Sequence, residues 1–453
     1  MNPTSDTLKD FYKRMLSLAL PVVFQSLLAN SLSFVDTLMI GQLGEQAIAA
    51  VGLANQMFFL ISLLFFGITS GSSIFLAQYW GAKNEGNIKK VMGISLTIAI
   101  VGSCIFAIAS FAVPNSIMHI FTRVPAVVEY GSSYLRIVAI SYIFSAVSQI
   151  FSTALRVVGH AKTPLKVAIV SLTINAVGNY LLIFGIGPFP ELGVAGAAIS
   201  TAFSRLVEVI ALLVIVYRKH PVLAIREKSA FHWNKRFLNN IVPTCLPVIL
   251  NEFFWALGMT AYKIAYSKMG INPIAAVNVT ESIGNLFFVA MIGVSNATLI
   301  MIGVKIGEGK MTLAKIYAKR FILTALGVGI AAGAFEALFA STFASLFNIT
   351  QQVRQMAIYC LYVNALLLPI KSMNMSIIVG ILRSGGDTRY SMFAEMFGVW
   401  AVGVPLAFFG SMVLHLDIWN LYLLLGLEEA TKLVIGLIRI KKGSWINDLT
   451  NVH

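Results

Sequence analysis

The chain has 453 residues, of which 58% are hydrophobic and 11% are charged, whereas about a quarter of the residues in a soluble domain are charged. Its mean hydropathy of +0.82 excludes a disordered chain, a collagen-like fibre, a coiled coil and an ordinary cytosolic enzyme. The net charge of +14 would suggest nucleic acid in a soluble protein. In a chain this apolar we expect an all-α integral membrane protein and no nucleic-acid partner.

Apolar runs separated by polar segments predict twelve transmembrane helices embedded in the lipid bilayer. In chain order they occupy residues 16–41, 48–79, 91–113, 128–156, 165–186, 194–217, 238–266, 274–304, 320–346, 356–382, 390–413 and 417–438. Several of these runs are longer than the bilayer is thick, so we expect tilted helices or protruding ends.

The basic residues predict the orientation of these helices. With the N-terminus inside, 25 of the 33 lysines and arginines fall in cytoplasmic segments, three fall on the opposite side and five lie within spans. Such an asymmetry places basic loops in the cytoplasm. We therefore expect a multi-pass protein of a bacterial-type inner (plasma) membrane with both termini cytoplasmic.

The sequence repeats itself at an offset of about 226 residues. An internal repeat of this kind indicates that the fold is built from two similar units. The matched segments are Leu20-Pro21-Val22 with Leu246-Pro247-Val248, Gly44 with Gly270, Ala50-Val51 with Ala276-Val277, Gly67 with Gly293, Gly81 with Gly307, and, at 227, Leu155-Arg156 with Leu382-Arg383. Both halves begin inside, so the repeat is parallel. It predicts two six-helix bundles related by a pseudo-two-fold axis along the membrane normal, as in transporters.

This repeat divides the chain into three predicted parts. Residues 1–217 form an N-lobe with helices 1–6, residues 218–237 form a basic cytoplasmic linker, and residues 238–453 form a C-lobe with helices 7–12. A duplicated scaffold without transport is the alternative to a transporter.

Polar side chains from four predicted helices of the N-lobe share one depth. Asp36 lies about five residues, or roughly 8 Å, below the outer end of its helix. Asn175 and Asn179 are four residues apart, hence on one helix face, and Thr201 and Tyr134 lie at a similar depth. Because a carboxylate in hydrocarbon is costly, we expect this layer to hold Na⁺ or a proton. Interhelical hydrogen bonding is the structural alternative.

The C-lobe does not repeat this layer, since Tyr262 aligns with Asp36 and Val402 with Asn175. It has its own intramembrane polar residues instead, which we expect to be linked to substrate or protons: Glu252, Asn251, Lys371 and Glu281. A Glu252–Lys371 ion pair would reduce the cost of burial. An unpaired Glu252 would instead attract a cationic substrate.

The sequence contains few motifs for enzymatic or metal chemistry. There is no Walker A loop, which disfavours ATP as the energy source, and no HExxH motif. The three cysteines lie in apolar runs without metal-ligand spacing. We therefore expect neither an enzyme nor a cofactor.

Ordered fragments along nearly the whole chain resemble the multidrug and toxic compound extrusion (MATE) family of the MOP flippase superfamily. They are Leu20-Pro21, Val35-Asp36-Thr37-Leu38-Met39-Ile40-Gly41, Leu43-Gly44, Ala49-Ala50-Val51-Gly52, Leu155-Arg156 before Gly159, Gly193-Val194-Ala195-Gly196-Ala197-Ala198, Pro247, Asn251-Glu252 and Leu382-Arg383-Ser384-Gly385-Gly386-Asp387-Thr388. Each fragment is weak alone, but their order and the six-plus-six repeat make the set specific.

The resemblance implies two bundles in a V shape, alternating access, and export of cationic amphiphiles against Na⁺ or H⁺. It maps the family's cation site onto Asp36, Asn175, Thr201 and Tyr134, with Na⁺ at the first three. Asn179 stands where many members carry a second acid, which leaves the ion open. A C-lobe acid of some members appears here as Ser372 beside Lys371, which makes Glu252 the acid of that lobe.

We therefore expect a monomeric secondary antiporter that exports organic cations or other toxic compounds. A lipid-linked sugar flippase of the same superfamily is the alternative. It would need basic groups for a pyrophosphate, and within the spans the sequence offers Arg136, Arg205 and Lys371 for this purpose. The substrate and the resting orientation have no readable motif.

Overall fold

The computed structural model describes residues 7–450, so residues 1–6 and 451–453 of the predicted lobes lie outside it. Within this range the chain is helical, and its one β element is an isolated bridge between Gly386 and Ile446. The α-helices are α1 (Leu8–Gly41), α2 (Glu45–Gly81), α3 (Glu85–Ala112), α4 (Pro114–Phe121), α5 (Pro125–Val157), α6 (Lys162–Phe184), α7 (Gly193–Lys219), α8 (Lys235–Ser267), α9 (Ile271–Gly307), α10 (Met311–Ser345), α11 (Gln351–Asn374), α12 (Thr388–Met396), α13 (Val404–Phe408) and α14 (Ile418–Lys442).

Each predicted span coincides with a helical segment, and eleven segments of the described chain are long and apolar enough to cross a membrane. The predicted twelfth span is helix α14, which is not among the eleven and carries Glu428, Glu429 and Lys432. The short helix α4 was not predicted. It begins at Pro114, whose missing N–H costs nothing in the first turn of a helix.

The chain folds as two compact units. Of the described residues, unit 1 comprises 7–23, 77–83 and 236–450, and unit 2 comprises 24–76 and 84–235. One boundary between the units, at residue 235, lies inside the predicted linker, residues 218–237. The beginning of α1 and the end of α2 nevertheless belong to the unit of the C-terminal half.

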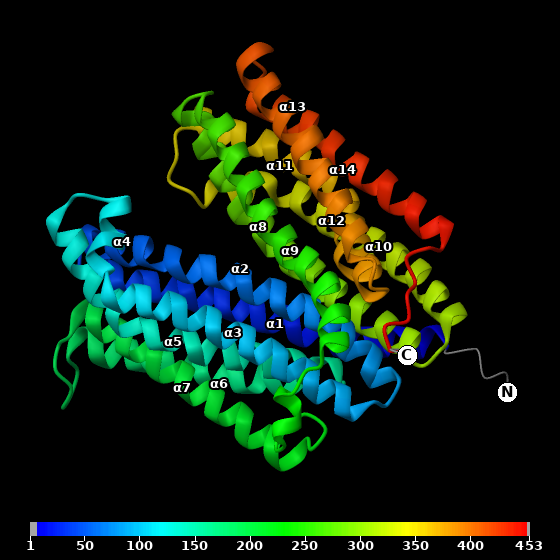
Figure 1. The fold of residues 1–453 in the computed structure, drawn as a ribbon. Helices are drawn as coiled ribbons and strands as arrows, with labels where there is room; N and C mark the ends of the chain where they lie inside the picture. The colour runs from blue at the N-terminus through cyan, green and yellow to red at the C-terminus, as the bar shows by residue number, and fades with distance from the viewer. Residues whose placement is uncertain (1–6, 451–453) are drawn as a thin grey trace. The chain divides into compact units, whose positions relative to one another are not determined.

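In unit 2, helix α5 packs against α3, α4 and α7, and α6 packs along α7 (Figure 1). Helix α5 is the most buried of these helices, with small residues such as Ser145, Ala146 and Ser148 on its packed faces. Small side chains allow helices to approach closely inside a membrane. This packing positions α6 and α7, which carry the amide and hydroxyl groups of the predicted cation layer.

In unit 1, α10 packs against α9 and α11, and α11 packs against α14 (Figure 1). Three π-helical segments interrupt the last spans: η2 (Met375–Leu382) continues α11, η3 (Phe397–Gly403) joins α12 to α13, and η4 (Phe409–Val413) follows α13. A π-helical turn shifts the phase of the residues that follow it and is often found at functional sites.

Two glycines at matched positions of the repeat mark a close crossing within unit 1. A Cβ on Gly81 would overlap the backbone oxygen of Val304, and a Cβ on Gly307 would overlap the backbone oxygen of Gln78. Both the glycines and their partners are 226 residues apart, so the end of α2 contacts the end of α9 reciprocally. A two-fold relation produces contacts of this kind.

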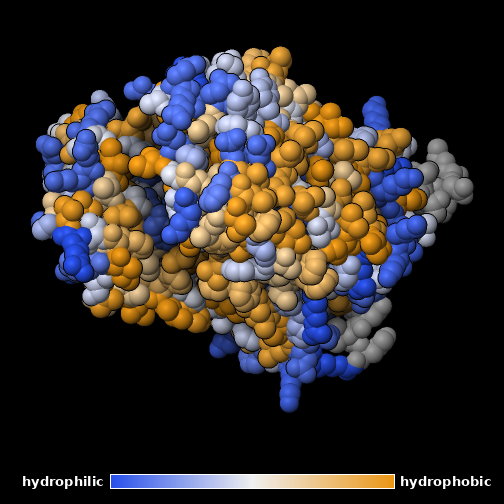
Figure 2. Space-filling model, turned by 90° about the horizontal axis from the view of Figure 1, so that it is seen from above, coloured by the Kyte–Doolittle hydropathy of each residue, from blue (hydrophilic) through white to orange (hydrophobic). Residues whose placement is uncertain are grey.

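The surface of the molecule is strongly apolar. Phe111 on α3, Leu338 on α10 and Leu366 on α11 are all more than half exposed. Hydrophobic side chains cover much of the face in Figure 2 and extend well beyond single scattered residues. Apolar patches of this extent mark contact with a membrane or a partner, and together with the eleven apolar helices they identify a multi-pass membrane protein.

Candidate cation site in the N-terminal half

The carboxylate of Asp36, on α1, lies against the amide of Asn179, on α6. The Asn179 Nδ2 donates a hydrogen bond of 2.7 Å to the Asp36 Oδ1. Asn179 is 1% exposed and Asp36 is half-buried, and both belong to unit 2. The structure thus joins two residues of the predicted layer that are 143 positions apart in the chain.

One turn away on α6, Asn175 contacts helix α7. Its Nδ2 lies 3.3 Å from the Thr201 Oγ1 and 3.4 Å from the Ser200 Oγ. Ser200 in turn donates a 2.8 Å hydrogen bond to the backbone oxygen of Asn175. Ser200 is buried, and the sequence analysis did not single it out. Its position one residue before Thr201 was the available signal.

Tyr134 lies in the same unit but makes a different contact. Its buried hydroxyl group donates to the Asn55 Oδ1 on α2 at 3.4 Å. Asn55 is exposed and was also missed, although an amide within an apolar run is the kind of residue that merits notice. The same hydroxyl group also hydrogen-bonds Thr201 on α7, so Tyr134 connects α2 to the predicted layer.

The charges around Asp36 leave it without a direct counterion. In the described part of the chain no ion pair to Asp36 is found, and the arginine within its electrostatic range, Arg205, pairs with Glu208 at 2.8 Å. The Oδ1 of Asn179 is buried and has no hydrogen-bond partner. A carboxylate beside an unused amide oxygen and neighbouring hydroxyl groups can bind a hard cation or a proton.

The donor set fits Na⁺ better than a transition metal. No group of three or more His, Cys, Asp or Glu side chains capable of holding a metal occurs among residues 7–450. Na⁺ would therefore have to take one carboxylate oxygen from Asp36 and neutral oxygens from its neighbours. Soft or multiply charged metals prefer thiolate, imidazole or several carboxylates.

The predicted C-lobe residues are not gathered into one site. Glu252 forms a buried ion pair with Arg383, with 2.9 Å between Oε1 and Nη2, and not with Lys371. Arg383 lies just beyond the predicted span 356–382, which would place it in a cytoplasmic loop, whereas the structure leaves it 1% exposed directly after η2. Lys371 instead donates a 2.7 Å hydrogen bond to the Asn364 Oδ1.

The two remaining predicted residues of this half differ in exposure. Asn251, next to Glu252 on α8, is buried, and its Oδ1 has no hydrogen-bond partner. Glu281, on α9, lies 3.3 Å from Lys263, and the side chains of Lys263 and Glu281 are 61% and 40% exposed. An exposed pair of this kind is typical of surface electrostatics and contributes little.

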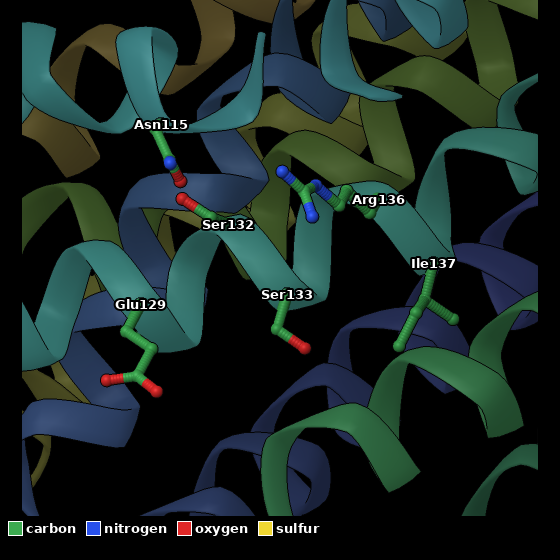
Figure 3. Close-up of a pocket in the computed structure, with 6 residues that line it drawn as sticks. All are labelled: Asn115, Glu129, Ser132, Ser133, Arg136 and Ile137. Carbon is green, nitrogen blue, oxygen red and sulfur yellow. The ribbon is translucent and has the colours of Figure 1, made fainter. Parts of the chain in front are cut away.

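A separate cavity of about 340 Å³ lies between α4 and α5 in unit 2. Asn115, Glu129, Ser132 and Arg136 are among its lining residues. Figure 3 shows the side chains of Asn115 and Ser132 pointing toward one another, with Arg136 on the same side of α5. The lining carries one acid and one base, and Asp36 is not part of it.

Comparisons with known proteins agree on one protein family. The family model described as MatE matches residues 21–181 and 247–409, one stretch in each half of the chain. The chain is 26% identical to "Uncharacterized transporter YisQ" of Bacillus subtilis, over 95% of this chain and 94% of the relative. It is 23% identical to "Probable multidrug resistance protein NorM" of Thermotoga maritima, over 87% and 85%.

Solved structures show the same fold. The Vibrio cholerae MATE transporter VcmN in the bent form superimposes with a TM-score of 0.86, at 17% identity over 97% of this chain and 99% of that chain. A crystal structure of MATE in the bent conformation gives a TM-score of 0.87, at 21% identity over 96% and 97%.

Proposed function

Because the chain belongs to the MatE family of transporters, we propose that it is a secondary antiporter that exports organic cations in exchange for Na⁺ or H⁺ bound at Asp36. The observation that carries this proposal is the half-buried carboxylate of Asp36, which has an amide donor beside it and no described ion pair. Such a group can gain and release a small cation, whereas a paired carboxylate is already compensated.

Binding at Asp36 would do work only if it biased the protein between two states. A ligand shifts a conformational equilibrium by the difference in its affinity for the two states. We propose that the coupling cation favours one orientation and that the exported compound favours the other. The rest of the layer, Asn175, Asn179, Thr201 and Tyr134, would supply neutral oxygens or hold α6 and α7 in place.

The class of exported compound follows from the relatives. The names of several relatives describe probable multidrug resistance proteins, and we extend multidrug efflux to this chain. We propose cationic amphiphiles as its substrates. We also propose that the protein works as a monomer in a bacterial-type plasma membrane, with both termini in the cytoplasm.

Alternating access requires two parts that can move against each other, so that a site between them opens to each side of the membrane in turn. We propose the pseudo-two-fold axis along the membrane normal that the repeat predicts. Its support is the reciprocal contact in which Gly81 meets Val304 and Gly307 meets Gln78. In repeat-built transporters such axes relate the parts that move.

A lipid-linked sugar flippase is less well supported by the basic side chains. Arg205 pairs with Glu208, and Lys371 donates to Asn364, so neither is available for a pyrophosphate without breaking these contacts. Arg136 lines the α4–α5 cavity together with the acidic Glu129. One arginine beside a carboxylate is a poor site for a multiply charged anion.

The test is efflux of a fluorescent organic cation, ethidium, from proteoliposomes on which Na⁺ and pH gradients are imposed separately. We expect one of the two gradients to drive efflux by the wild type and neither to drive it in Asp36→Asn. Thr37→Val is the matched control, because this exposed neighbour bonds only to the Ser33 carbonyl of its own helix in the described hydrogen bonds. Undiminished gradient-driven efflux by Asp36→Asn would overturn the proposal.

A further inference from the structure

The interior of unit 1 holds more carboxyl groups than basic groups. Leaving aside the pairs Glu252–Arg383, Lys305–Glu308 and Asp387–Arg439, the acids are Glu336 on α10, Glu395 on α12, and Glu428 and Glu429 on α14; the bases are Lys371 on α11 and Lys432 on α14. The most exposed of the four acids, Glu429, has 17% of its side chain exposed. Fully ionised, the set would carry two uncompensated negative charges in an apolar interior, which costs several kcal/mol or more.

Among these four acids, Glu336 is the one without a described ion pair. It is completely buried, and both of its carboxyl oxygens contact the same donor, the Asn364 Nδ2, at 3.0 and 3.1 Å. Lys371 reaches it indirectly, since its Nζ donates to the Oδ1 of the same amide at 2.7 Å. One shared amide hydrogen-bond donor is little support for a buried carboxylate, which is stable when several donors or a cation contact it directly.

The other three acids share one base. The Lys432 Nζ lies 2.9 Å from Glu428, 3.0 Å from Glu429 and 3.8 Å from Glu395. Glu428 also accepts a 2.5 Å hydrogen bond from the Tyr262 hydroxyl group on α8. Glu428 and Glu429 therefore have direct hydrogen-bond donors and Glu395 lies within 4 Å of the ammonium group, but that single ammonium group neutralises only one of their charges.

A second, independent observation is a buried hydrogen-bond acceptor without a donor. Asn374, on α11, is 4% exposed and donates through Nδ2 to the Glu429 Oε2 at 2.7 Å. Its Oδ1 is buried within this same network and has no hydrogen-bond partner. Buried polar atoms normally have hydrogen-bond partners. The network therefore lacks a hydrogen-bond donor as well as positive charge.

The surrounding backbone is shaped for this network. A Cβ on Gly403, the last residue of η3, would overlap the Tyr262 hydroxyl group and lie 2.7 Å from the Glu428 Oε2. The π-helical segment η2 begins directly after Asn374, and η3 begins two residues after Glu395. The unit therefore makes room for the charged groups rather than filling the space with apolar side chains.

We propose that Glu336 carries an exchangeable proton, so that unit 1 contains a second proton-binding site, independent of Asp36. Ionisation releases this proton to water and leaves a carboxylate that accepts hydrogen bonds from Asn364 and is countered by Lys371 through the same amide. The charged and titratable groups around the site are Lys371 and Cys360 on α11, Tyr422, Glu428, Glu429 and Lys432 on α14, Glu281 on α9, Glu395 on α12, and Tyr262 and Tyr266 on α8.

The proton can be observed directly by infrared spectroscopy. The full chain, synthesised with ¹³C-labelled glutamate and placed in lipid vesicles, should show at neutral pH the C=O stretch of a protonated glutamic acid, because exposed carboxyl groups are then ionised. We expect Glu336→Gln to remove half or more of this band. The matched control Glu281→Gln, in the exposed pair with Lys263, should keep it.

A second variant covers the case in which Glu336→Gln does not fold. In Glu336→Asp the carboxyl group remains but is no longer labelled, so the band should lose its isotope shift. An undiminished band in Glu336→Gln, an unchanged isotope shift in Glu336→Asp, the absence of any such band in the wild type, or its loss on addition of Na⁺ would overturn the proposal. Asp36→Asn should keep the band, so this result stands apart from that of the efflux assay.

Discussion

At one matched position of the repeat, unit 2 has the acceptor Asp36 and unit 1 has the donor Tyr262. Asp36 accepts from the neutral amide of Asn179 at 2.7 Å, whereas Tyr262 donates to Glu428 at 2.5 Å. The first contact leaves a carboxylate without a direct counterion, and the second adds a hydrogen bond to an acid that already contacts Lys432. The two halves thus retain a common helical framework while their polar interiors differ.

The surroundings of each carboxylate determine whether it can exchange a cation. A carboxylate without a direct ion pair can bind a cation and release it, since no basic group of the described chain contacts it. A carboxylate within a network of acids and bases changes charge only if the network accommodates the change. Four substitutions test this difference between the two units.

The largest effect should come from the buried pair of unit 1. Arg383→Met leaves Glu252 buried without its cation, and breaking a buried pair in this way costs about 3–5 kcal/mol. We expect a strongly lowered temperature of unfolding, measured by the reaction of the buried Cys360 with a fluorescent thiol reagent. The exposed pair provides the control, because Lys263→Met should cost about 1 kcal/mol or less. Equal unfolding temperatures for the two variants would contradict the assigned pair.

The next effect concerns the amide of unit 2. Asn179→Leu removes the hydrogen-bond donor described for Asp36, and a hydrogen bond to a charged group is worth about 1.5–3 kcal/mol. We expect the concentration of coupling ion at half-maximal efflux to change by about 10- to 100-fold. Thr173→Leu, on the exposed face of the same helix, should leave it unchanged. An unchanged value in Asn179→Leu would remove Asn179 from the site.

The crossing of α2 and α9 tests what the two halves share. Gly307→Ala places a Cβ against the backbone oxygen of Gln78, and overpacking of this kind costs about 1–3 kcal/mol. Gly327→Ala, where no atom lies within 4 Å of the added Cβ, should be neutral or stabilising. If both variants unfold at the same temperature, the close contact is not present.

The smallest effect lies at the end of α9. Partial burial opposes ionisation of Glu308, but the hydrogen bond from Lys310 and the charge of Lys305 outweigh it and lower its pKa below the ordinary value. A lowered pKa stabilises the fold above the unfolded pKa of about 4.3, and this contribution is lost as the pH falls through the folded pKa. Glu308→Gln should therefore cost less than about 1 kcal/mol at neutral pH and nothing in strong acid. A difference that stays constant with pH would contradict the ion pairs.

The apolar runs predicted the helices because a membrane requires long, internally bonded apolar segments. Depth along those helices also placed Asp36, Asn175, Asn179 and Thr201 in one half, and the structure brings them together in the pairs Asp36–Asn179 and Asn175–Thr201. The same reasoning works for side chains on regular helices, because the rise per residue is constant.

The partner of Glu252 was not predictable in this way. Arg383 follows η2, and π-helical turns shift the phase of the chain, so regular helical spacing does not show where that side chain points. The pairing of Glu336 with Asn364 depends on how α10 packs against α11, which the sequence of neither helix contains. Charge content could be counted from the sequence, but its distribution among pairs could not.

The most direct test of cation coupling at Asp36 reverses the direction of the efflux assay. Coupling between two ligands is reciprocal, so an ethidium gradient imposed across proteoliposomes without any ion gradient should drive Na⁺ or H⁺ in the opposite direction, measured with a ²²Na⁺ tracer and a trapped pH dye. We predict this counterflow for the wild type and for Thr37→Val, and its absence in Asp36→Asn. Ion counterflow that persists in Asp36→Asn, or ethidium movement without ion counterflow in the wild type, would contradict the account.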